Sequence, residues 1–153
     1  MKVSAHLPPD RIYLGAALPD KDAVLRFVSA AFMKNNAARD PEKVYQVLKQ
    51  REALMSTGIG GGIGIPHALT DELDDLVIVL IRLKAGIPFD AFDHRPVDIV
   101  VGLGVPENET SMHLRALAGI SGLLKKPGMQ KTIRSIGDPL ALWNQIRQAE
   151  EDA

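Results

Sequence analysis

The chain contains two runs of apolar residues that are predicted to be buried strands. Residues 76–81 form an unbroken aliphatic run, and residues 97–103 are similar except for Asp98 and Gly102. Strands that are apolar on both faces lie in the middle of a sheet that helices cover on both sides. Proline and aspartate residues between the two runs mark turns. We therefore expect both runs to be central strands, and residues 11–18 to form a shorter strand or extended segment.

Several other segments repeat apolar residues at helical spacing and begin with helix start signals. An aspartate precedes a proline at Asp40-Pro41 and again at Asp138-Pro139, which places a capping carboxylate before a proline at the first helical position. Asp20 or Asp22 offers a cap to an earlier helix. Helices are predicted at residues 21–35, from Pro41 through Arg51, and at residues 110–125, 127–136 and 139–149. The residues expected on the buried side of the second helix are Val44, Val47, Leu48 and Leu54.

These predicted elements fit one α/β domain. The chain has 153 residues, which is a usual size for one domain, and no internal repeat or long linker divides it. Strands mixed with helices predict a mixed β-sheet flanked by helices on both faces. We expect the domain to span residues 1–153, with an irregular, proline-rich arm at 1–10 and a frayed, acidic tail at 150–153.

Composition narrows the classes of function. The formal net charge is −1, so electrostatics favours neither nucleic acid nor an anionic membrane surface as a partner. The chain has no cysteine, which excludes disulfides, thiolate nucleophiles and cysteine zinc sites. The N-terminus lacks the apolar core of a signal peptide, and the longest aliphatic run is far too short to span a bilayer. We therefore expect a cytoplasmic protein that does not insert into a membrane.

The segment from Ser56 to His67 is the most informative part of the sequence. It carries five glycines within residues 58–64 and ends in Ile65-Pro66-His67. Glycine lets the backbone approach a ligand closely, and successive N–H groups in such a segment can cradle an anion such as phosphate. A flexible loop or a tight turn beside a strand explains the same glycines equally well. Glycine content alone leaves both interpretations open.

Two histidines and one arginine are candidates for a site shared with this segment. Pro66 stiffens the backbone before His67, which suits a ring that must present one nitrogen. His113 lies one turn into the 110–125 helix, and apolar residues follow it at helical spacing, so it is expected on the buried face. Arg51 precedes the glycines, where a guanidinium is placed to meet phosphate oxygens. Structural explanations also exist: a hydrogen-bonded core histidine for either ring, and a helix-end cation for Arg51.

Motifs for other chemistries are missing or incomplete. A P-loop needs Gly-Lys-Ser/Thr after its glycines, where this chain has Ile65-Pro66-His67. The dinucleotide pattern G-x-G-x-x-G fails at its last glycine, and the G-x-S-x-G elbow of serine hydrolases is absent. A metal site is open to the two candidate histidines with Glu107 or Glu109, although no H-E-x-x-H motif supports it. His6, in the arm, and His94, in a turn, are not expected to act.

Six segments spread along the chain carry a resemblance to a known family. They are Arg51-Glu52-Ala53-Leu54, Ser56-Thr57-Gly58-Ile59-Gly60, Ile65-Pro66-His67, Pro88-Phe89-Asp90-Ala91, Pro96-Val97-Asp98 and His113-Leu114. They resemble the IIA domain of the bacterial phosphoenolpyruvate-dependent phosphotransferase system, fructose/mannitol type, and within it the nitrogen-regulatory branch. The resemblance extends from about Ile12 to Ile146, which is nearly the whole chain. An arginine followed by S-T-G-x-G and I-P-H is far more specific than a lone glycine motif.

The resemblance implies a chemistry for the candidate residues. In that family, the histidine matching His67 accepts phosphate from the histidine of a small carrier protein, HPr or its nitrogen-branch relative (NPr). The histidine matching His113 supports it, and the arginine matching Arg51 belongs to the active site. The implied fold is a mixed sheet flanked by helices, and we expect no cofactor and no metal. A phosphate-binding loop is expected to hold the phosphoryl oxygens together with the arginine. Its residues are Ser56, Thr57, Gly58, Gly60 and Gly62.

Three residues depart from the common form of the family, and more than one function remains open. Gly64 stands where alanine is frequent, Gly61 where a polar residue is frequent, and Met55 replaces a common glycine. We expect no IIB or membrane IIC part after the last helix, and this favours a free-standing regulatory role with its own target proteins over a sugar-specific transporter component. The alternatives are a sugar-specific IIA component that passes phosphate to a separate IIB protein, a non-catalytic regulatory binding module, and a metal hydrolase. We also expect an exposed apolar rim around His67 as a transient docking site for the carrier.

Overall fold

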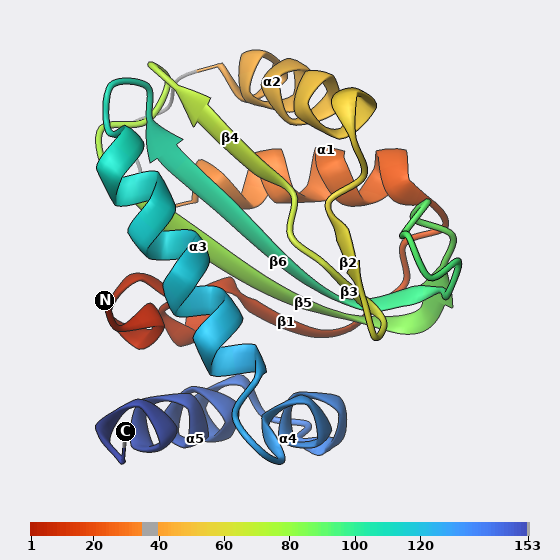
Figure 1. Ribbon diagram of the computed structural model, residues 1–153, viewed down its shortest axis with the longest axis vertical. Helices are drawn as coiled ribbons and strands as arrows, with labels where there is room; N and C mark the ends of the chain where they lie inside the picture. Colours follow the sequence, from red (N-terminus) through yellow and green to blue (C-terminus); the bar gives the residue numbers. More distant parts are fainter. Residues whose placement is uncertain (35–39, 153) are drawn as a thin grey trace.

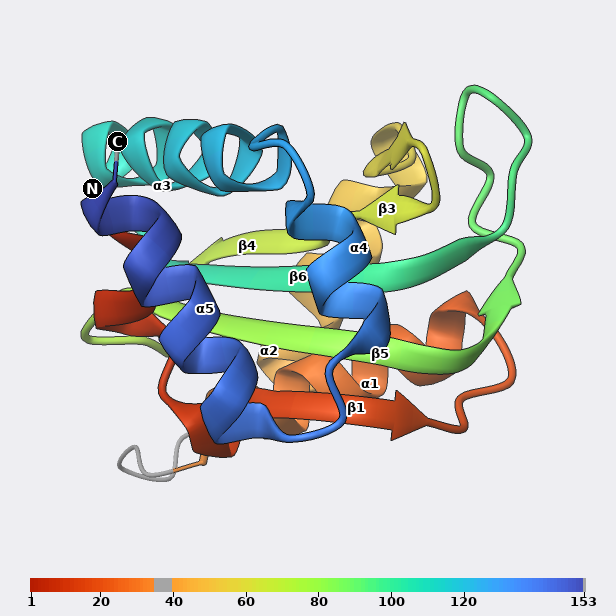
Figure 2. The same ribbon diagram turned by 90° about the horizontal axis from the view of Figure 1, so that it is seen from below.

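The computed structural model describes residues 1–34 and 40–152 of the chain. One mixed sheet separates two groups of helices, as Figure 1 and the turned view in Figure 2 show. In chain order, the elements are two short 3-10 helices, η1 (Val3–His6) and η2 (Pro9–Arg11), then β1 (Ile12–Ala16), α1 (Lys21–Phe32), α2 (Pro41–Leu54), β2 (Gly58–Gly60), β3 (Ile63–Gly64), β4 (His67–Thr70), β5 (Val77–Ile87), β6 (Val97–Pro106), α3 (Thr110–Leu124), α4 (Met129–Ser135) and α5 (Pro139–Glu151).

The sheet has six strands and contains both parallel and antiparallel pairs. β5 and β6 form its antiparallel centre, and β1 runs parallel to β5 on one side. On the other side, β6 pairs in parallel with β3 near its start and with β4 near its end. β2 is antiparallel to β3. The predicted mixed sheet flanked by helices on both faces is confirmed, and the two aliphatic runs lie at its centre.

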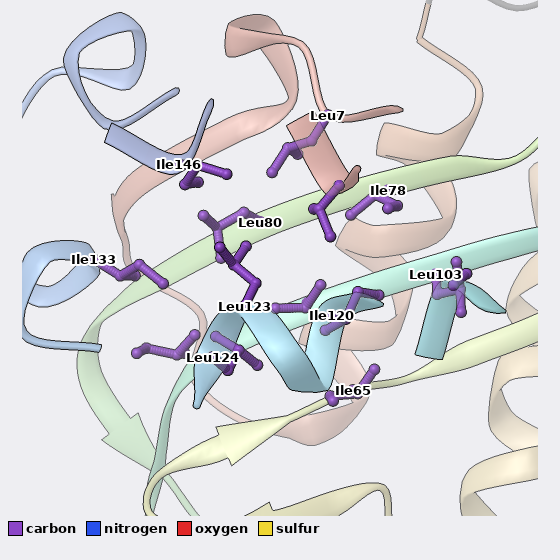
Figure 3. Packing of buried hydrophobic residues seen from close by; sticks show 14 of the residues in the cluster. Leu7, Ile65, Ile78, Leu80, Leu103, Ile120, Leu123, Leu124, Ile133 and Ile146 are labelled. Carbon is purple, nitrogen blue, oxygen red and sulfur yellow. The ribbon is translucent and has the colours of Figure 1, made fainter. Parts of the chain in front are cut away.

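Side chains of the central strands alternate between two hydrophobic cores. Ile78 and Leu80 of β5 belong to the core under α3, α4 and α5, whereas Val79 and Ile81 belong to the core under α1 and α2. A strand that is covered on both faces needs apolar residues at every position, which explains the unbroken aliphatic run. In the first core, the labelled helix side chains in Figure 3 are Ile120, Leu123, Leu124, Ile133 and Ile146.

Two glycines in β6 let α1 lie close to the sheet. A Cβ added at Gly102 would lie 2.7 Å from Cγ1 of Val28, and one at Gly104 would lie 3.0 Å from Cε2 of Phe32, both in α1. Both distances are below van der Waals contact, so a side chain at either position would push its neighbours outward. α1 and α2 pack against one another over this face, which brings the first turn of α1 next to the last turn of α2.

The predicted helices are confirmed, and the two central strands are longer than their aliphatic runs. The side chains of Asp20, Asp40 and Asp138 accept hydrogen bonds from N–H groups in the first turns of α1, α2 and α5. β5 extends to Ile87, beyond the end of its aliphatic run. Its second half is partly exposed, so polar residues are tolerated there. The predicted end of the first helix, Asn35, lies outside the described residues. No helix within residues 1–34 and 40–152 is long and apolar enough to cross a membrane.

The two ends of the chain are more regular than the sequence indicates. The expected irregular arm forms η1 and η2, and its side chains Val3 and Leu7 are buried. The expected frayed tail is helical as far as Glu151, and the carboxylate of Glu150 accepts hydrogen bonds from the N–H groups of Val3 and Ser4. The difference arises because two apolar side chains of the arm are buried against the helices, and the acidic tail satisfies the arm's backbone N–H groups.

Candidate active site

The glycine-rich segment folds into a β-hairpin beside β6. β2 and β3 are antiparallel, and Gly60 at the end of β2 and Gly61 and Gly62 in the turn all have positive φ. Glycine adopts positive φ without the steric penalty of other residues, so these three glycines permit the tight turn. After β3, the chain continues through Ile65 and Pro66 into β4, whose first residue is the candidate nucleophile.

β3 and β4 follow one another along β6, and β4 begins with His67. The pairing register with β6 does not shift across Ile65 and Pro66, and the carbonyl of Pro66 accepts a hydrogen bond from the N–H of Leu103 at 3.0 Å. Ile65 and Leu69 pack in the core beneath α3, where Figure 3 labels Ile65. Because side chains alternate along a strand, His67 lies on this same face, which α3 covers.

Both ring nitrogens of His67 have a defined partner. Nδ1 lies 2.9 Å from the carbonyl oxygen of Ile65, which can only accept, so Nδ1 carries the hydrogen. Nε2 lies 3.1 Å from Nε of Arg51, which can only donate. The two contacts assign the same tautomer of the neutral ring, with the lone pair on Nε2. The residue is only 9% exposed, so its surroundings hold the ring firmly in place.

Arg51 reaches this ring from the last turn of α2. Its Nη1 donates a hydrogen bond to the carbonyl oxygen of Met55 at 2.8 Å, which ties the guanidinium to the end of the helix. Its Nε donates to Nε2 of His67. A guanidinium has five N–H donors in a planar fork, so this one can bind an anion beside the ring as well as these two acceptors.

His113 lies beside His67 in the first turn of α3. The centroids of the two rings are 5.0 Å apart, and their planes make an angle of 41°. Nε2 of His113 is buried and has no hydrogen-bond partner among the described residues. A buried polar atom without a partner is unfavourable by about 1–3 kcal/mol. This nitrogen therefore marks a place where a substrate atom would gain a hydrogen bond. The residue as a whole is half-buried, less covered than the helix pattern predicts.

The surroundings lower the pKa of both histidines. Burial is the main cause that lowers the pKa of His67. The hydrogen bond to the Ile65 carbonyl raises that pKa, the charge of Arg51 lowers it, and the charge of Glu52 raises it. The pKa of His113 is lowered first by burial, then by His67 and Arg51. Histidine ordinarily titrates near a pH of about 6.5, so lower pKa values leave both rings uncharged at neutral pH. The lone pair on Nε2 of His67 is then available to a phosphorus atom.

His67 lines a surface hollow of about 590 Å³. Three large apolar residues that line the hollow are exposed to solvent: Met55, Ile59 and Phe92. They form the apolar rim expected around the histidine, and an exposed apolar patch is typical of a binding surface. Leu54 was expected on the buried side of α2, but it is 82% exposed because α2 ends at this residue and the chain turns towards β2.

The tip of the hairpin lies outside the hollow that His67 lines. Gly60 and Gly62 were expected to bind phosphate, but neither lines the hollow. The N–H of Gly61 donates to Oδ2 of Asp93 at 2.9 Å, and its carbonyl accepts from Nη2 of Arg134 at 2.9 Å. Of the two original interpretations of these glycines, the tight turn beside a strand fits the tip.

The start of the segment does line the hollow, with its polar groups engaged by the protein. Ser56, Thr57 and Gly58 are lining residues. The N–H of Gly58 donates to Oγ of Ser56 at 3.0 Å, and Oγ of Ser56 donates to the carbonyl oxygen of Phe89 at 2.6 Å. The N–H of Thr57 donates to a carboxylate oxygen of Glu52 at 2.9 Å. These three residues therefore form a rigid wall of the site.

Glu52 is a residue near the site that the sequence interpretation did not single out. Its carboxylate is buried at the end of α2 and contacts Thr57. The buried residues of α2 are Val44, Tyr45, Leu48 and Glu52. Glu52 follows Leu48 by four residues, so it lies on the buried face of the helix. That position was the signal in the sequence that its carboxylate would be buried.

The remaining histidines lie outside the hollow. His94 is exposed in the loop between β5 and β6, and His6 lies in η1. Glu107 and Glu109, the carboxylates of the alternative metal site, are exposed. Across residues 1–34 and 40–152, no group of three or more His, Asp or Glu side chains is arranged to hold a metal ion.

Known proteins share this sequence and fold. The sequence model of the family described as "Phosphoenolpyruvate-dependent sugar phosphotransferase system, EIIA 2" matches residues 5–149. A nitrogen regulatory protein of Bradyrhizobium diazoefficiens is 31% identical over 144 residues, which cover 94% of each chain. The crystal structure of nitrogen regulatory protein IIA-Ntr from Neisseria meningitidis has a TM-score of 0.86 at 25% identity, covering 94% of this chain and 98% of that one. A chain of the Escherichia coli complex of enzyme IIAMTL and phosphorylated enzyme IIBMTL has a TM-score of 0.73 at 22% identity, covering 89% and 95%.

The chain therefore belongs to the EIIA type-2 family of the phosphoenolpyruvate-dependent sugar phosphotransferase system. The Bradyrhizobium and Neisseria proteins both carry the name nitrogen regulatory protein, in agreement with the branch that the motifs resemble. The likeness to the mannitol complex shows that the fold is shared beyond that branch.

Proposed function

We propose that this protein is a cytoplasmic histidine phosphoryl carrier, which accepts phosphate from an HPr-type or NPr-type protein onto His67 and acts in the nitrogen-regulatory branch. The observation that carries the proposal is the tautomer of His67, whose hydrogen on Nδ1 leaves the Nε2 lone pair beside Arg51. Family membership supports the phosphoryl chemistry, and the names of the relatives support the regulatory branch.

In the transfer step, the lone pair on Nε2 of His67 attacks the phosphorus of the carrier's phosphohistidine, in line with the bond that breaks. A new P–N bond forms on His67. The electron pair of the old P–N bond returns to the carrier's ring, which leaves as neutral imidazole if its other nitrogen is protonated. Nδ1 of His67 keeps its hydrogen, and the Ile65 carbonyl at 2.9 Å stabilises the positive charge that develops on the attacking ring.

Arg51 and His113 would stabilise the phosphoryl group. In the unphosphorylated protein, the Nε–H of Arg51 donates to the nitrogen that attacks, so the guanidinium must move from this nitrogen to the phosphoryl oxygens as the bond forms. The unpartnered Nε2 of His113 would gain a hydrogen bond to one of the same oxygens. Both groups act best where charge develops in a site that excludes water.

The apolar rim of the hollow suits the docking of a carrier. Met55, Ile59 and Phe92 are exposed around the site, and each lies on a different element or loop. A small apolar surface of this kind favours a transient encounter, which a phosphoryl carrier needs because it must release its partner after transfer.

Phosphate labelling tests this proposal. The protein is incubated with phosphoenolpyruvate, the first enzyme of the system and an HPr-type or NPr-type carrier, and label on the protein is followed with time. Wild type should acquire label that is lost in acid and retained in alkali, as expected of phosphohistidine, and His67→Ala should acquire none. His94→Ala removes an exposed histidine outside the hollow, so it should label like wild type.

A supporting role for His113 makes a graded prediction. His113→Ala should label roughly 100-fold more slowly with residual transfer, because one donor to the phosphoryl oxygens is lost. Unchanged kinetics would show that His113 is only a packing residue.

Labelling of His67→Ala at the wild-type rate would contradict the whole proposal. Failure of wild type to label with either carrier would favour a regulatory binding module, and rapid passage of label to a IIB protein would favour a sugar-specific component.

A further inference from the structure

The carboxylate of Glu52 is buried beside the site but does not take part in the transfer step. Its side chain is only 4% exposed. It does not line the hollow of His67 but lines a second hollow of about 560 Å³. Met55, Ser56 and Asp90 line both hollows, so the two are neighbours. A buried carboxylate is strongly unfavourable unless it is paired and hydrogen-bonded, so its partners indicate what it holds in place.

Three donors meet this carboxylate, and two of them come from Thr57. Oε1 of Glu52 accepts hydrogen bonds from Nζ of Lys21 and from the N–H of Thr57, both at 2.9 Å. Oε2 accepts from Oγ1 of Thr57 at 2.6 Å. The backbone and side chain of one wall residue are thus bound to a single carboxylate, and Lys21 of α1 supplies the compensating charge.

Thr57 is connected in turn to the ring of His67. The carbonyl oxygen of Thr57 accepts a hydrogen bond from the N–H of Ile65 at 3.0 Å. The carbonyl oxygen of Ile65 accepts from Nδ1 of His67 at 2.9 Å. A continuous series of hydrogen bonds therefore runs from Glu52 through Thr57 and Ile65 to the nitrogen that fixes the tautomer.

We infer that Glu52 is a positioning residue for phosphoryl transfer, which holds the ring and tautomer of His67 through Thr57 and Ile65. The inference rests on the proposed function, because Glu52 would affect the rate of transfer only through Thr57 and Ile65, the two residues that connect it to His67. Small displacements of a reacting group are costly to rate, so a residue that never touches substrate can still control the reaction.

The charge of Glu52 also acts on the ring directly. It raises the pKa of His67, against burial and Arg51, which lower it. Without this carboxylate the pKa of His67 should fall further, which gives the positioning role a signature that simple loss of packing does not produce. The titratable and charged groups around the ring are Arg51 and Glu52 from α2, His113 from α3 and Asp90 from the loop after β5, with Lys21 of α1 paired to Glu52 and Asp90.

Glu52→Gln tests the inference with a side chain of the same shape. The matched control is Glu42→Gln, which removes an exposed carboxylate from the first turn of the same helix. Two quantities are measured: the initial rate of labelling from the carrier, and the titration and tautomer of His67 by NMR of the unphosphorylated protein. Glu52→Gln should label roughly 10- to 100-fold more slowly, with a lower His67 pKa and a less uniform Nδ1–H tautomer. Glu42→Gln should match wild type in both.

Thr57→Val is the second variant, because it removes one hydrogen bond and keeps the carboxylate. It should slow labelling while leaving the pKa of His67 nearer to wild type than Glu52→Gln does. If Glu52→Gln does not fold, the labelling rate of Thr57→Val and the tautomer of His67 in that variant decide the question. Wild-type rates and an unchanged His67 titration in the folded variants would overturn the inference. If wild type itself does not label, the proposed function fails, and the NMR titration still decides whether Glu52 holds the ring.

Discussion

At the level of single residues, the two histidines of the site differ in their hydrogen-bond partners. His67 has a partner at each nitrogen, Ile65 and Arg51, so one tautomer is fixed. His113 lies 5.0 Å away between ring centroids and has a buried nitrogen without a partner among the described residues. A ring with a fixed lone pair suits the phosphoryl acceptor, and a ring with an unused nitrogen suits the group that binds the phosphoryl oxygens.

The pH dependence of the two rings follows from the same contacts. Burial is the largest cause that lowers the pKa of both His67 and His113. As the pH falls, the unfolded chain therefore binds protons at these residues at a higher pH than the folded protein does. The free energy of unfolding should then rise with pH between the folded pKa values and the ordinary histidine value. The contribution of the neutral rings is complete above a pH of about 6.5 and is lost as the pH falls through the folded pKa values. NMR titration of the two rings measures this, and midpoints above the ordinary histidine value would contradict it.

The sequence was sufficient to name the candidate site residues but not their contacts. His67, Arg51 and His113 were all candidates from their motifs, and the structure brings the three together. Glu52 was not predicted as a site residue, because only the packing of α2 against the wall residue Thr57 shows that its carboxylate is buried. Gly60 and Gly62 were expected at the phosphate, because glycine content alone does not distinguish an anion cradle from a hairpin turn.

At the scale of elements, long apolar patterns were predictable and short glycine-rich strands were not. The runs that became β5 and β6 were predicted as central strands, and Asp40 and Asp138 correctly marked the starts of α2 and α5. β2 and β3 have three and two residues and consist mostly of glycine, which has low strand propensity. Their strand geometry comes from pairing with each other and with β6, and that pairing is tertiary structure.

Two glycine-to-alanine variants should have opposite effects on stability. Gly62 has φ of +82°, and an added Cβ would lie 2.8 Å from Nη2 of Arg134, so Gly62→Ala should destabilise the fold by about 1–2 kcal/mol. Gly122 lies in α3 with nothing within 4 Å of an added Cβ, so Gly122→Ala should stabilise it by about 0.5–1 kcal/mol. Denaturant unfolding measures both. An unaffected Gly62→Ala would show that the hairpin tip does not need its left-handed backbone.

At the scale of the whole molecule, the ends of the chain are tied together and complete one core. The first 3-10 helix, η1, lies beside the end of α5, as Figure 2 shows. The hydrogen bonds from Val3 and Ser4 to Glu150 join them, and Leu7 fills space among the residues of the core under α3, α4 and α5. The fold class was predictable, but the order of both ends was not, because it depends on contacts between residues about 147 positions apart.

Leu7→Ala tests whether the N-terminal arm is part of this core. Leu7 is 1% exposed, so removing most of its side chain should destabilise the protein by about 2–5 kcal/mol. The matched control is Leu140→Ala in α5, where the side chain is 55% exposed and the change in the free energy of unfolding should stay within about 0.5 kcal/mol. Equal, small effects of the two substitutions would show that the arm does not pack on the domain.

In the proposed function, Nε2 of His67 carries the phosphoryl group. The most direct measurement is NMR of the nitrogen-15-labelled protein after phosphorylation through its carrier, which identifies the ring and the nitrogen bonded to phosphorus. We expect phosphorus on Nε2 of His67, with the hydrogen still on Nδ1 and bound to the Ile65 carbonyl. Phosphorus on Nδ1 of His67, on His113 or on any other residue would contradict it.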